Sequence, residues 1–272
     1  MVVFPPAKIN LGLNILDKRP DGFHNLETVF YPIDLYDVLE VIVCPDADID
    51  FEFTQTGVPL DCAPEKNLCY KAFQRIKSSF PEIEPIKVHL HKTIPTGAGM
   101  GGGSSDGAFM LQLLKSIFNL TISDAVLKNM ALELGSDCPF FLVNRPSLAL
   151  GRGEIISHCP IQLKGFHILI VNPGIHINTG WAFNALDKDR IPNSLTQLAE
   201  IPINEWNKWV KNDFEKPVFH HYPEIASIKE SLYEQGAVFA SMSGSGSTVF
   251  GIFKDKPQAL PHFPESYFCK WV

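Results

Sequence analysis

The stretch that decides the fold is PTGAGMGGGSSD, at residues 95–106. It follows an apolar, strand-like run at 87–94 and precedes a strongly apolar, helix-like run at 104–118. Five of the seven positions from 97 to 103 are glycine, so the backbone can turn its N–H groups inward and come close to a ligand. The stretch therefore predicts a binding loop between a strand and a helix.

The end of this loop adds a second signal. Ser104 and Ser105 are good N-cap residues, so the following helix should begin here and direct its partial positive charge at the loop. Backbone N–H groups and a helix start together predict an anion site suited to phosphate. Composition alone also leaves open a flexible surface loop.

Two familiar nucleotide loops fit this stretch poorly. Gly97, Gly99 and Gly102 formally match G-x-G-x-x-G, but Pro95 interrupts the step from strand to turn. No second strand ends in an acidic residue about 20 positions further on, as the dinucleotide fingerprint requires. No Gly-Lys-Ser/Thr follows either, which excludes a Walker A loop. The phosphates must therefore be held mostly by backbone.

Bulk composition limits the class of protein. The chain has 272 residues, of which 45% are hydrophobic and 19% charged, which is ordinary for a soluble globular protein. The length suggests two domains or one large one, and a change of pattern near residue 155 predicts domains at 1–155 and 156–272. The net charge of -7 lacks the basic footprint of a nucleic-acid binder.

The cysteines and the N-terminus indicate the compartment. No cysteine pair has C-x-x-C spacing, so we expect free, mostly buried thiols of a reducing environment. The first residues carry no basic leader, and no apolar run is long enough to span a bilayer. We expect a cytoplasmic protein, or one of an organelle stroma, with no membrane or nucleic-acid partner, as a monomer or weak homodimer. The cysteines are Cys44, Cys62, Cys69, Cys138, Cys159 and Cys269.

Helices and strands are mixed along the chain without strict alternation, which favours an α+β fold over a doubly wound sheet. Residues 8–15 alternate as a strand that places Lys8, Asn10 and Asn14 on one face. Further strands are predicted at 37–44, 49–56, 87–94, 167–171, 237–242 and 248–253. Helices are predicted at 67–79, 104–118, 123–134, 179–186 and 204–210, and from Pro223 to before Gly236.

Two further segments carry polar or small residues between apolar ones. Residues 6–13 read PAKINLGL, in which Lys8 taken alone is more often a solvated strand lysine. Residues 241–250 read SMSGSGSTVF, a Ser/Gly turn between apolar strands whose small residues also allow a ligand to approach closely. Each segment is a weak signal by itself.

The three segments, in this order and spacing, resemble the three motifs of the GHMP kinases. The resemblance implies an N-terminal ribosomal-protein-S5-like domain, a C-terminal ferredoxin-like domain, and ATP with Mg²⁺ as phosphoryl donor. It further implies the branch whose substrate is a cytidine diphosphate-linked methylerythritol. The supporting segments are residues 19–24 (RPDGFH), 66–68 (KNL), 134–140 (LGSDCPF), 151–154 (GRGE) and 212–215 (NDFE).

The sequence departs from the family's pattern at two positions. Phe23 stands where tyrosine is common, which keeps the ring and loses a hydroxyl. Gly107 stands where alanine is usual, which slightly weakens helix propensity. Neither change touches the chemistry.

By resemblance, Asp137 is the catalytic base, which also contacts the substrate, and Lys8 is its partner. Lys8 could keep Asp137 ionised and offset developing phosphoryl charge. Asp137 could otherwise be an N-cap for the turn at Pro139. No residue is identified as a Mg²⁺ ligand, although Ser105 is a candidate beside the phosphates themselves.

The resemblance also assigns binding residues. Phe23 and His24 match the cytosine-recognition pair, although His24 could be an ordinary loop histidine. Asn10 would bind substrate or orient Lys8, or be a bare polar strand residue. Asn67 and Lys92 fall where the adenosine pocket forms, with a solvated surface role as the alternative. The loop residues that would bind ATP are Pro95, Thr96, Gly97, Ala98, Gly99, Met100, Gly101, Gly102, Gly103, Ser104 and Ser105.

Two other functions remain open at this point. One is a different GHMP small-molecule kinase, of the homoserine or mevalonate type. The other is a catalytically silent protein of the same fold that senses a nucleotide, against which the presence of both Lys8 and Asp137 argues.

Overall fold

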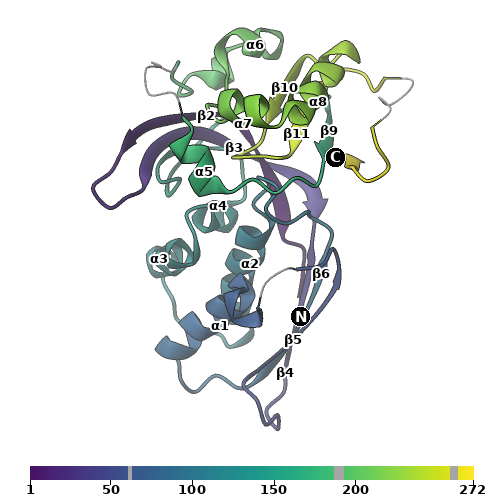
Figure 1. Cartoon of the computed structure of the whole chain (residues 1–272). Coiled ribbons are helices and arrows are strands. Elements are labelled where there is room, and N and C mark those ends of the chain that lie inside the picture. Colours follow the sequence, from purple (N-terminus) through teal and green to yellow (C-terminus); the bar gives the residue numbers. More distant parts are fainter. Residues whose placement is uncertain (61–62, 187–192, 258–262) are drawn as a thin grey trace. The chain divides into compact units, whose positions relative to one another are not determined.

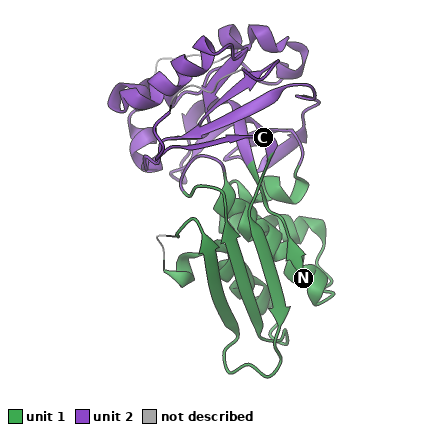
Figure 2. Cartoon of the chain, turned by 90° about the vertical axis from the view of Figure 1, so that its right-hand side faces the viewer, with its two compact units in different colours: residues 1–7, 34–96, 101–144 green, residues 8–33, 97–100, 145–272 purple. Residues whose placement is uncertain are grey.

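The computed structural model describes residues 1–60, 63–186, 193–257 and 263–272. The chain forms two compact units, each assembled from separate stretches of sequence (Figure 2). Unit 1 comprises residues 1–7, 34–96 and 101–144, and unit 2 comprises residues 8–33, 97–100 and 145–272. The predicted linear boundary near residue 155 stays a prediction.

Unit 1 contains a four-stranded sheet in the order β1-β4-β6-β5. β5 and β6 are parallel, and the other two pairs are antiparallel. β6 alternates buried and more exposed residues because one face packs on the core. The strands are β1 (Val2–Val3), β4 (Val38–Val43), β5 (Phe51–Gly57) and β6 (Ile86–Lys92).

Among the described residues, four α-helices and a short 3₁₀ turn at Pro64–Lys66 complete unit 1 (Figure 1). Asn67 caps α1, where its side chain accepts a hydrogen bond from the Cys69 N–H at 2.8 Å. Ser123 caps α3 through its side chain, which accepts from the Val126 N–H, at the residue where the sequence predicted the helix to begin. The helices are α1 (Leu68–Ser79), α2 (Gly102–Ile117), α3 (Asp124–Leu134) and α4 (Cys138–Val143).

Helix α2 begins two residues earlier than predicted. Its N-cap is Gly101, in the left-handed region with φ +69°, so Ser104 and Ser105 lie in the first turn and the prediction that they cap the helix was wrong. Glycine reaches that conformation without steric cost, which lets the chain enter the helix directly from the loop. The positive end of α2 still lies at the glycine loop.

Gly107 has a packing role that the sequence did not reveal. A Cβ at this position would lie 2.9 Å from the Cβ of Leu68. The glycine therefore lets α2 pack closely against the start of α1, which offsets its weak helix propensity.

Unit 2 contains two four-stranded sheets, in the orders β2-β3-β7-β8 and β10-β11-β9-β12. The mixture of sheets and helices confirms the predicted α+β class. β2 is longer than the predicted strand and is buried on both faces from Pro6 to Asn14. The strands are β2 (Pro6–Lys18), β3 (His24–Tyr36), β7 (Ser147–Gly151), β8 (Ile155–His158), β9 (His167–Asn172), β10 (Phe239–Met242), β11 (Val249–Phe253) and β12 (Phe268–Trp271).

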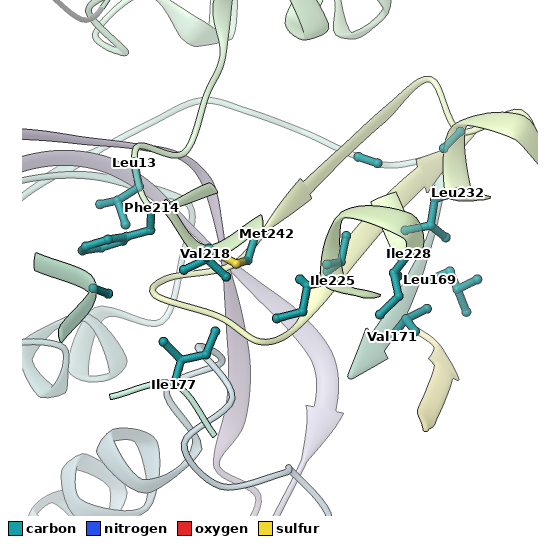
Figure 3. Packing of buried hydrophobic residues seen from close by; sticks show 14 of the residues in the cluster. Leu13, Leu169, Val171, Ile177, Phe214, Val218, Ile225, Ile228, Leu232 and Met242 are labelled. Carbon is teal, nitrogen blue, oxygen red and sulfur yellow. The ribbon is translucent and has the colours of Figure 1, made fainter. Parts of the chain in front are cut away.

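The core of unit 2 forms where α8 packs on the second sheet (Figure 3). α8 buries Ile225, Ile228 and Leu232, which lie three and four residues apart and so share one face of the helix. Leu13 of β2 and Phe214 extend the same cluster. The helices of unit 2 are α5 (Thr179–Asn184), α6 (Trp206–Trp209), α7 (Glu215–His221) and α8 (Pro223–Glu234), with short 3₁₀ turns at Leu198–Glu200 and Ile203–Glu205.

Within the described ranges, every helix is too short or too polar to cross a bilayer. Cys69, Cys138 and Cys159 are buried free thiols, as expected, whereas Cys44 is half-buried and Cys269 is exposed. Cys62 lies outside the described residues.

Candidate active site

The glycine loop is shaped by positive backbone angles. Gly97, Gly99 and Gly101 have φ of +63°, +78° and +69°, a region that other residues rarely adopt. Gly99 is also constrained by packing, because a Cβ there would lie 2.0 Å from the carbonyl oxygen of Ser243. The middle of the loop, residues 97–100, therefore packs directly on the Ser/Gly turn within unit 2.

Gly102 and Gly103 open helix α2 and have different reasons to be glycine. A Cβ on Gly102 would lie 2.9 Å from Cγ2 of Ile94. A Cβ on Gly103 would meet no atom within 4 Å, and its φ is not positive. Neither strain nor packing therefore explains Gly103, although glycine destabilises a helix by about 1 kcal/mol relative to alanine. Without a side chain at Gly103, phosphate oxygens can approach the backbone N–H groups at the start of the helix.

Lys8 and Asn10 lie together on β2, both 2% exposed. The Lys8 ammonium donates to Asn10 Oδ1 at 2.6 Å and to the Gly99 carbonyl at 3.1 Å, and it lies 5.0 Å from the centre of the Phe30 ring. Asn10 Nδ2 donates to Thr28 Oγ1 at 2.9 Å. The solvated-lysine alternative is therefore wrong, because Lys8 is held against the glycine loop.

The Ser/Gly turn completes this cluster. Ser243 Oγ donates to the Gly99 carbonyl at 2.8 Å and accepts from the Asn10 N–H at 3.2 Å. Asn212 Nδ2 donates to the carbonyls of Met242 and Gly244 at 2.7 and 2.8 Å. The three sequence motifs that contribute to unit 2 thus meet at one place, and the 212–215 segment holds the turn there.

Asp137 lies in unit 1, at the N-cap position of α4. Its carboxylate makes no capping hydrogen bond to that helix, so the alternative of a capping aspartate is wrong. The next residue, Cys138, hydrogen-bonds to Ser104 in the first turn of α2, and burial raises its thiol pKa to about 12. The segment that carries Asp137 therefore lies beside the start of α2. Lys8 and Asp137 belong to different units, so their pairing stays a prediction.

Lys92 is buried rather than solvated. Its ammonium is ion-paired with Asp37 and, at 2.8 Å, with Asp106, and its side chain is 1% exposed. Burial would lower the pKa of Lys92, but the two carboxylates outweigh it and raise that pKa. Burial, opposed by Lys92 and assisted by Asp37, raises the pKa of Asp106 to about 7.

This buried triad, Lys92 with Asp37 and Asp106, lies beside the residues that flank the glycine loop. Asp37 Oδ1 accepts from the N–H groups of Thr93 and Ile94 at 2.6 and 2.9 Å. The Lys92 ammonium lies 3.2 Å from where a Cβ on Gly102 would be. The Lys92 ammonium thus lies next to Gly102 at the end of the loop, whereas Asn67 caps α1. The binding of adenosine by either residue stays a prediction.

Phe23 and His24 are adjacent and differ in surroundings. Phe23 is 46% exposed and carries the Arg152 guanidinium over its ring at 3.6 Å. His24 stacks on Phe183 of α5, with ring centres 4.6 Å apart and an angle of 11°. Both rings belong to unit 2, and their arrangement provides flat surfaces beside a positive charge.

Sequence reasoning missed several residues of these clusters. Asp37, Asp106 and Thr28 bind the predicted residues directly, and Phe183 stacks on one of them. His176 lies against the loop, with Nδ1 3.1 Å from where a Cβ on Gly97 would be. Asp106 is the last residue of the quoted stretch, but nothing in its spacing reveals that Asp37 is its neighbour.

Comparisons with known proteins agree with this architecture. The family described as GHMP kinases N terminal domain matches residues 67–145, and the family GHMP kinases C terminal matches residues 194–260. A 4-diphosphocytidyl-2-C-methyl-D-erythritol kinase of Bacteroides fragilis (strain YCH46) is 46% identical over 269 residues, covering 99% of this chain and 98% of the relative.

Solved structures give the same result. A crystal structure of 4-(cytidine 5'-diphospho)-2C-methyl-D-erythritol kinase has a TM-score of 0.79 at 30% identity, covering 93% of this chain and 90% of the other. A homoserine kinase from Cytophaga hutchinsonii has a TM-score of 0.65 at 16% identity, covering 93% and 85%, and shares the fold alone. With near-complete coverage at this identity, the chain belongs to the GHMP kinases, in the family of 4-diphosphocytidyl-2-C-methyl-D-erythritol kinases.

Proposed function

We propose that this protein transfers the γ-phosphoryl group of ATP to the 2-hydroxyl of 4-diphosphocytidyl-2-C-methyl-D-erythritol. The observation that supports it best is Gly103, a helix glycine that neither strain nor packing requires. The loop around it presents backbone N–H groups at the start of α2, where a triphosphate is bound well. The identity of the acceptor is inferred from the chain's membership of the 4-diphosphocytidyl-2-C-methyl-D-erythritol kinase family.

Asp137 is the base in this proposal. An alcohol is a weak nucleophile, and a carboxylate that accepts its proton assists in-line attack on the γ-phosphoryl group. Lys8 contributes positive charge where phosphoryl charge develops, and Asn10 fixes the direction of its ammonium through the 2.6 Å hydrogen bond. Ser243 holds the Gly99 carbonyl that Lys8 also contacts, so the loop and the lysine are positioned together.

Mg²⁺ fits an unpartnered buried oxygen of unit 1. Among the described residues, Ser105 Oγ and Asp106 Oδ1 are buried oxygens of this unit without a hydrogen-bond partner, and no group of three or more His, Cys, Asp or Glu side chains is arranged for a metal. Asp106 is already ion-paired with Lys92, so Ser105 would be the protein's ligand, with phosphate oxygens and water supplying the rest. The ion would neutralise phosphate charge.

The test is an ADP-release assay with three acceptors: the cytidine-diphosphate-linked methylerythritol, homoserine and mevalonate. We expect turnover with the first alone. Turnover with homoserine or mevalonate would instead establish another GHMP kinase, and no turnover with tight nucleotide binding would establish a silent sensor.

Replacing Gly103 with alanine should raise stability and impair ATP use. The new methyl group meets open space and improves helix propensity by about 1 kcal/mol, so the melting temperature rises. The same methyl obstructs the approach of phosphate, so KM for ATP rises severalfold. Thermal unfolding and initial rates over an ATP series measure the two effects.

Gly107→Ala is the matched control on the same helix. Its Cβ meets Leu68 rather than the loop, so KM for ATP stays at the wild-type value. If Gly103→Ala binds ATP as the wild type does, this loop is not the phosphate site.

His24→Ala should weaken use of the full acceptor by about 1–3 kcal/mol in kcat/KM, the effect of an unpaired polar group. Free methylerythritol phosphate, which lacks the cytidylyl group, should be a very poor acceptor in wild type because remote contacts orient the reacting group. The variant should barely change that low rate.

His24→Phe separates stacking from hydrogen bonding, because it keeps a ring to stack on Phe183 and loses the ring nitrogens. It should lose as much as His24→Ala on the full acceptor. Equal losses on both acceptors in either variant would reject cytosine recognition by His24.

A further inference from the structure

Strand β5 forms an open edge of the sheet in unit 1. The sheet order places β5 at one end of the described strands, where it pairs with β6. The carbonyl of Asp50 accepts from the Ile86 N–H at 3.0 Å, and the Val58 N–H donates to the Lys92 carbonyl at 2.8 Å. The even-numbered residues from 50 to 58 therefore direct their backbone groups at β6.

The odd-numbered residues of β5 face the other way. Successive residues of a strand direct their N–H and C=O groups to opposite sides, so those of Phe51, Phe53, Gln55 and Gly57 point away from β6. Within the described ranges, these backbone groups make no hydrogen bond to the rest of the chain. Residues 54–57 are exposed, so another chain can reach this edge.

Natural proteins protect such edges, and β5 carries none of the usual devices. Short strands, lysine, proline and β-bulges prevent one sheet edge from pairing with another. β5 has seven residues, contains neither lysine nor proline, and pairs residue for residue with β6 without a bulge.

The other sheet edges of the described chain are shorter or covered. β1 has two residues, and β8, β10 and β12 have four each. β2 is long, but Leu13 hydrogen-bonds through its backbone to Lys211 and Asp213. Among the described strands, β5 is thus the long edge that is left unprotected.

A second copy of β5 is complementary to this edge. In an antiparallel pair about a two-fold axis, outward-facing residues must oppose outward-facing residues, so the axis passes through the position of one residue. Placing it at Thr54 pairs all seven residues of both strands. Phe51 then opposes Gly57 of the second copy, and Phe53 opposes Gln55. These outward-facing pairs exchange about eight hydrogen bonds in total.

The remaining side chains of this register are also compatible. Thr54 opposes itself on the axis, and threonine pairs across strands are favourable. Glu52 opposes Thr56 of the second copy rather than another carboxylate, and its charge is paired with Lys87 at 2.9 Å. Like charges therefore do not meet along the paired strands.

We propose that β5 is a homodimerisation edge, through which two copies pair antiparallel about Thr54 and join their sheets into one. A two-fold contact of a surface with itself is the commonest symmetry among oligomers. Each copy has a net charge of -7, and the resulting repulsion is screened at physiological salt. This contact uses none of the residues assigned above to ATP or acceptor, so it goes beyond the proposed function.

Sedimentation equilibrium of the full chain at physiological salt, from about 5 to about 500 µM, tests the association. The average mass should rise towards that of a dimer. Gln55→Pro should stay monomeric, because it removes an outward-facing N–H and leaves the hydrogen bonds to β6 intact. Gln55→Ala keeps that N–H and should associate as the wild type does. Thermal unfolding checks that both variants are folded.

Cysteine cross-linking tests the register without depending on a proline variant. Opposed residues of a pair that does not exchange hydrogen bonds lie about 4.5 Å apart at Cα, which suits a disulfide. The background is Cys269→Ser, which removes an exposed thiol and serves as the control for the other cysteines. In it, Thr54→Cys alone should form a covalent dimer on mild oxidation. Glu52→Cys and Thr56→Cys should each stay monomeric alone and cross-link when mixed.

A chain that stays monomeric over the whole concentration range would overturn the proposal. A dimer that Gln55→Pro leaves unchanged would also overturn it, because association would then use another surface. Cross-linking of Thr56→Cys alone as efficiently as Thr54→Cys would reject the register. These measurements need no kinase activity, so their failure is distinguishable from failure of the proposed function.

Discussion

Replacing Asp137 with asparagine lowers kcat by about 10²–10⁴-fold while ATP still binds, because a positioned base contributes a factor of that size. Asparagine has nearly the same shape and cannot accept the proton. The carboxylate does not cap α4, so the helix keeps its start. Single-turnover rates and calorimetric ATP titration measure the two properties separately.

Asp124→Asn is the matched control in the same unit. Asp124 lies in the first turn of α3, fully exposed, with Lys115 at 3.6 Å. Its replacement should leave kcat unchanged. Near-wild-type turnover in folded Asp137→Asn would contradict the assignment of the base.

Lys92→Met destabilises the protein by about 3–5 kcal/mol, the usual effect of removing one partner from a buried ion pair. Methionine fills a similar volume, but Asp37 and Asp106 remain buried without their cation. Lys87→Met is the control on the same strand, because its pair with Glu52 is exposed on both sides and its loss should have little effect. Urea unfolding of both variants decides the point; equal small effects would show that the triad is not a stability element.

The same variant should respond to pH in a defined direction. The folded pKa of Asp106 is already raised to about 7, above the ordinary value near 3.9, so the stability that this group contributes is complete at low pH and is lost as pH rises through about 7. Removing Lys92 raises the folded pKa further, since a neighbouring cation is lost. The deficit of Lys92→Met relative to wild type should therefore grow from pH 5.5 to pH 8, and a constant deficit would contradict this account.

Much of the fold could be predicted because its patterns are local. The spacing of Ile225, Ile228 and Leu232 predicts the buried face of α8, and Ser123 predicts the start of α3. β3 was missed although it has 13 residues, because polar residues interrupt its apolar alternation. Helix α4, at 138–143, was not predicted from the sequence. Proline usually breaks a helix and is tolerated only in the first turn, which is where Pro139 stands.

The candidate site divides in the same way. The glycine loop, Lys8 and the Ser/Gly turn were each visible as segments whose order resembles the family's motifs, whereas their contacts at Gly99 come from the structure. The partners of Lys92 were not visible, because Asp37 is separated from it by 55 residues and no local pattern joins them. Phe183 was likewise predicted only as part of a helix, since a stacked pair leaves no signal in spacing.

The assembly of each unit from separate stretches has a consequence for synthesis on the ribosome. Leu13 leaves the ribosome about two hundred residues before Lys211 and Asp213, whose backbones hydrogen-bond to it. Its strand can pair early with β3, but the side of Leu13 that packs on Phe214 and α8 stays uncovered for most of translation, as an apolar surface open to chaperones. Unit 1 needs no residue beyond Asn144, so the nascent chain can complete it while unit 2 is still being made.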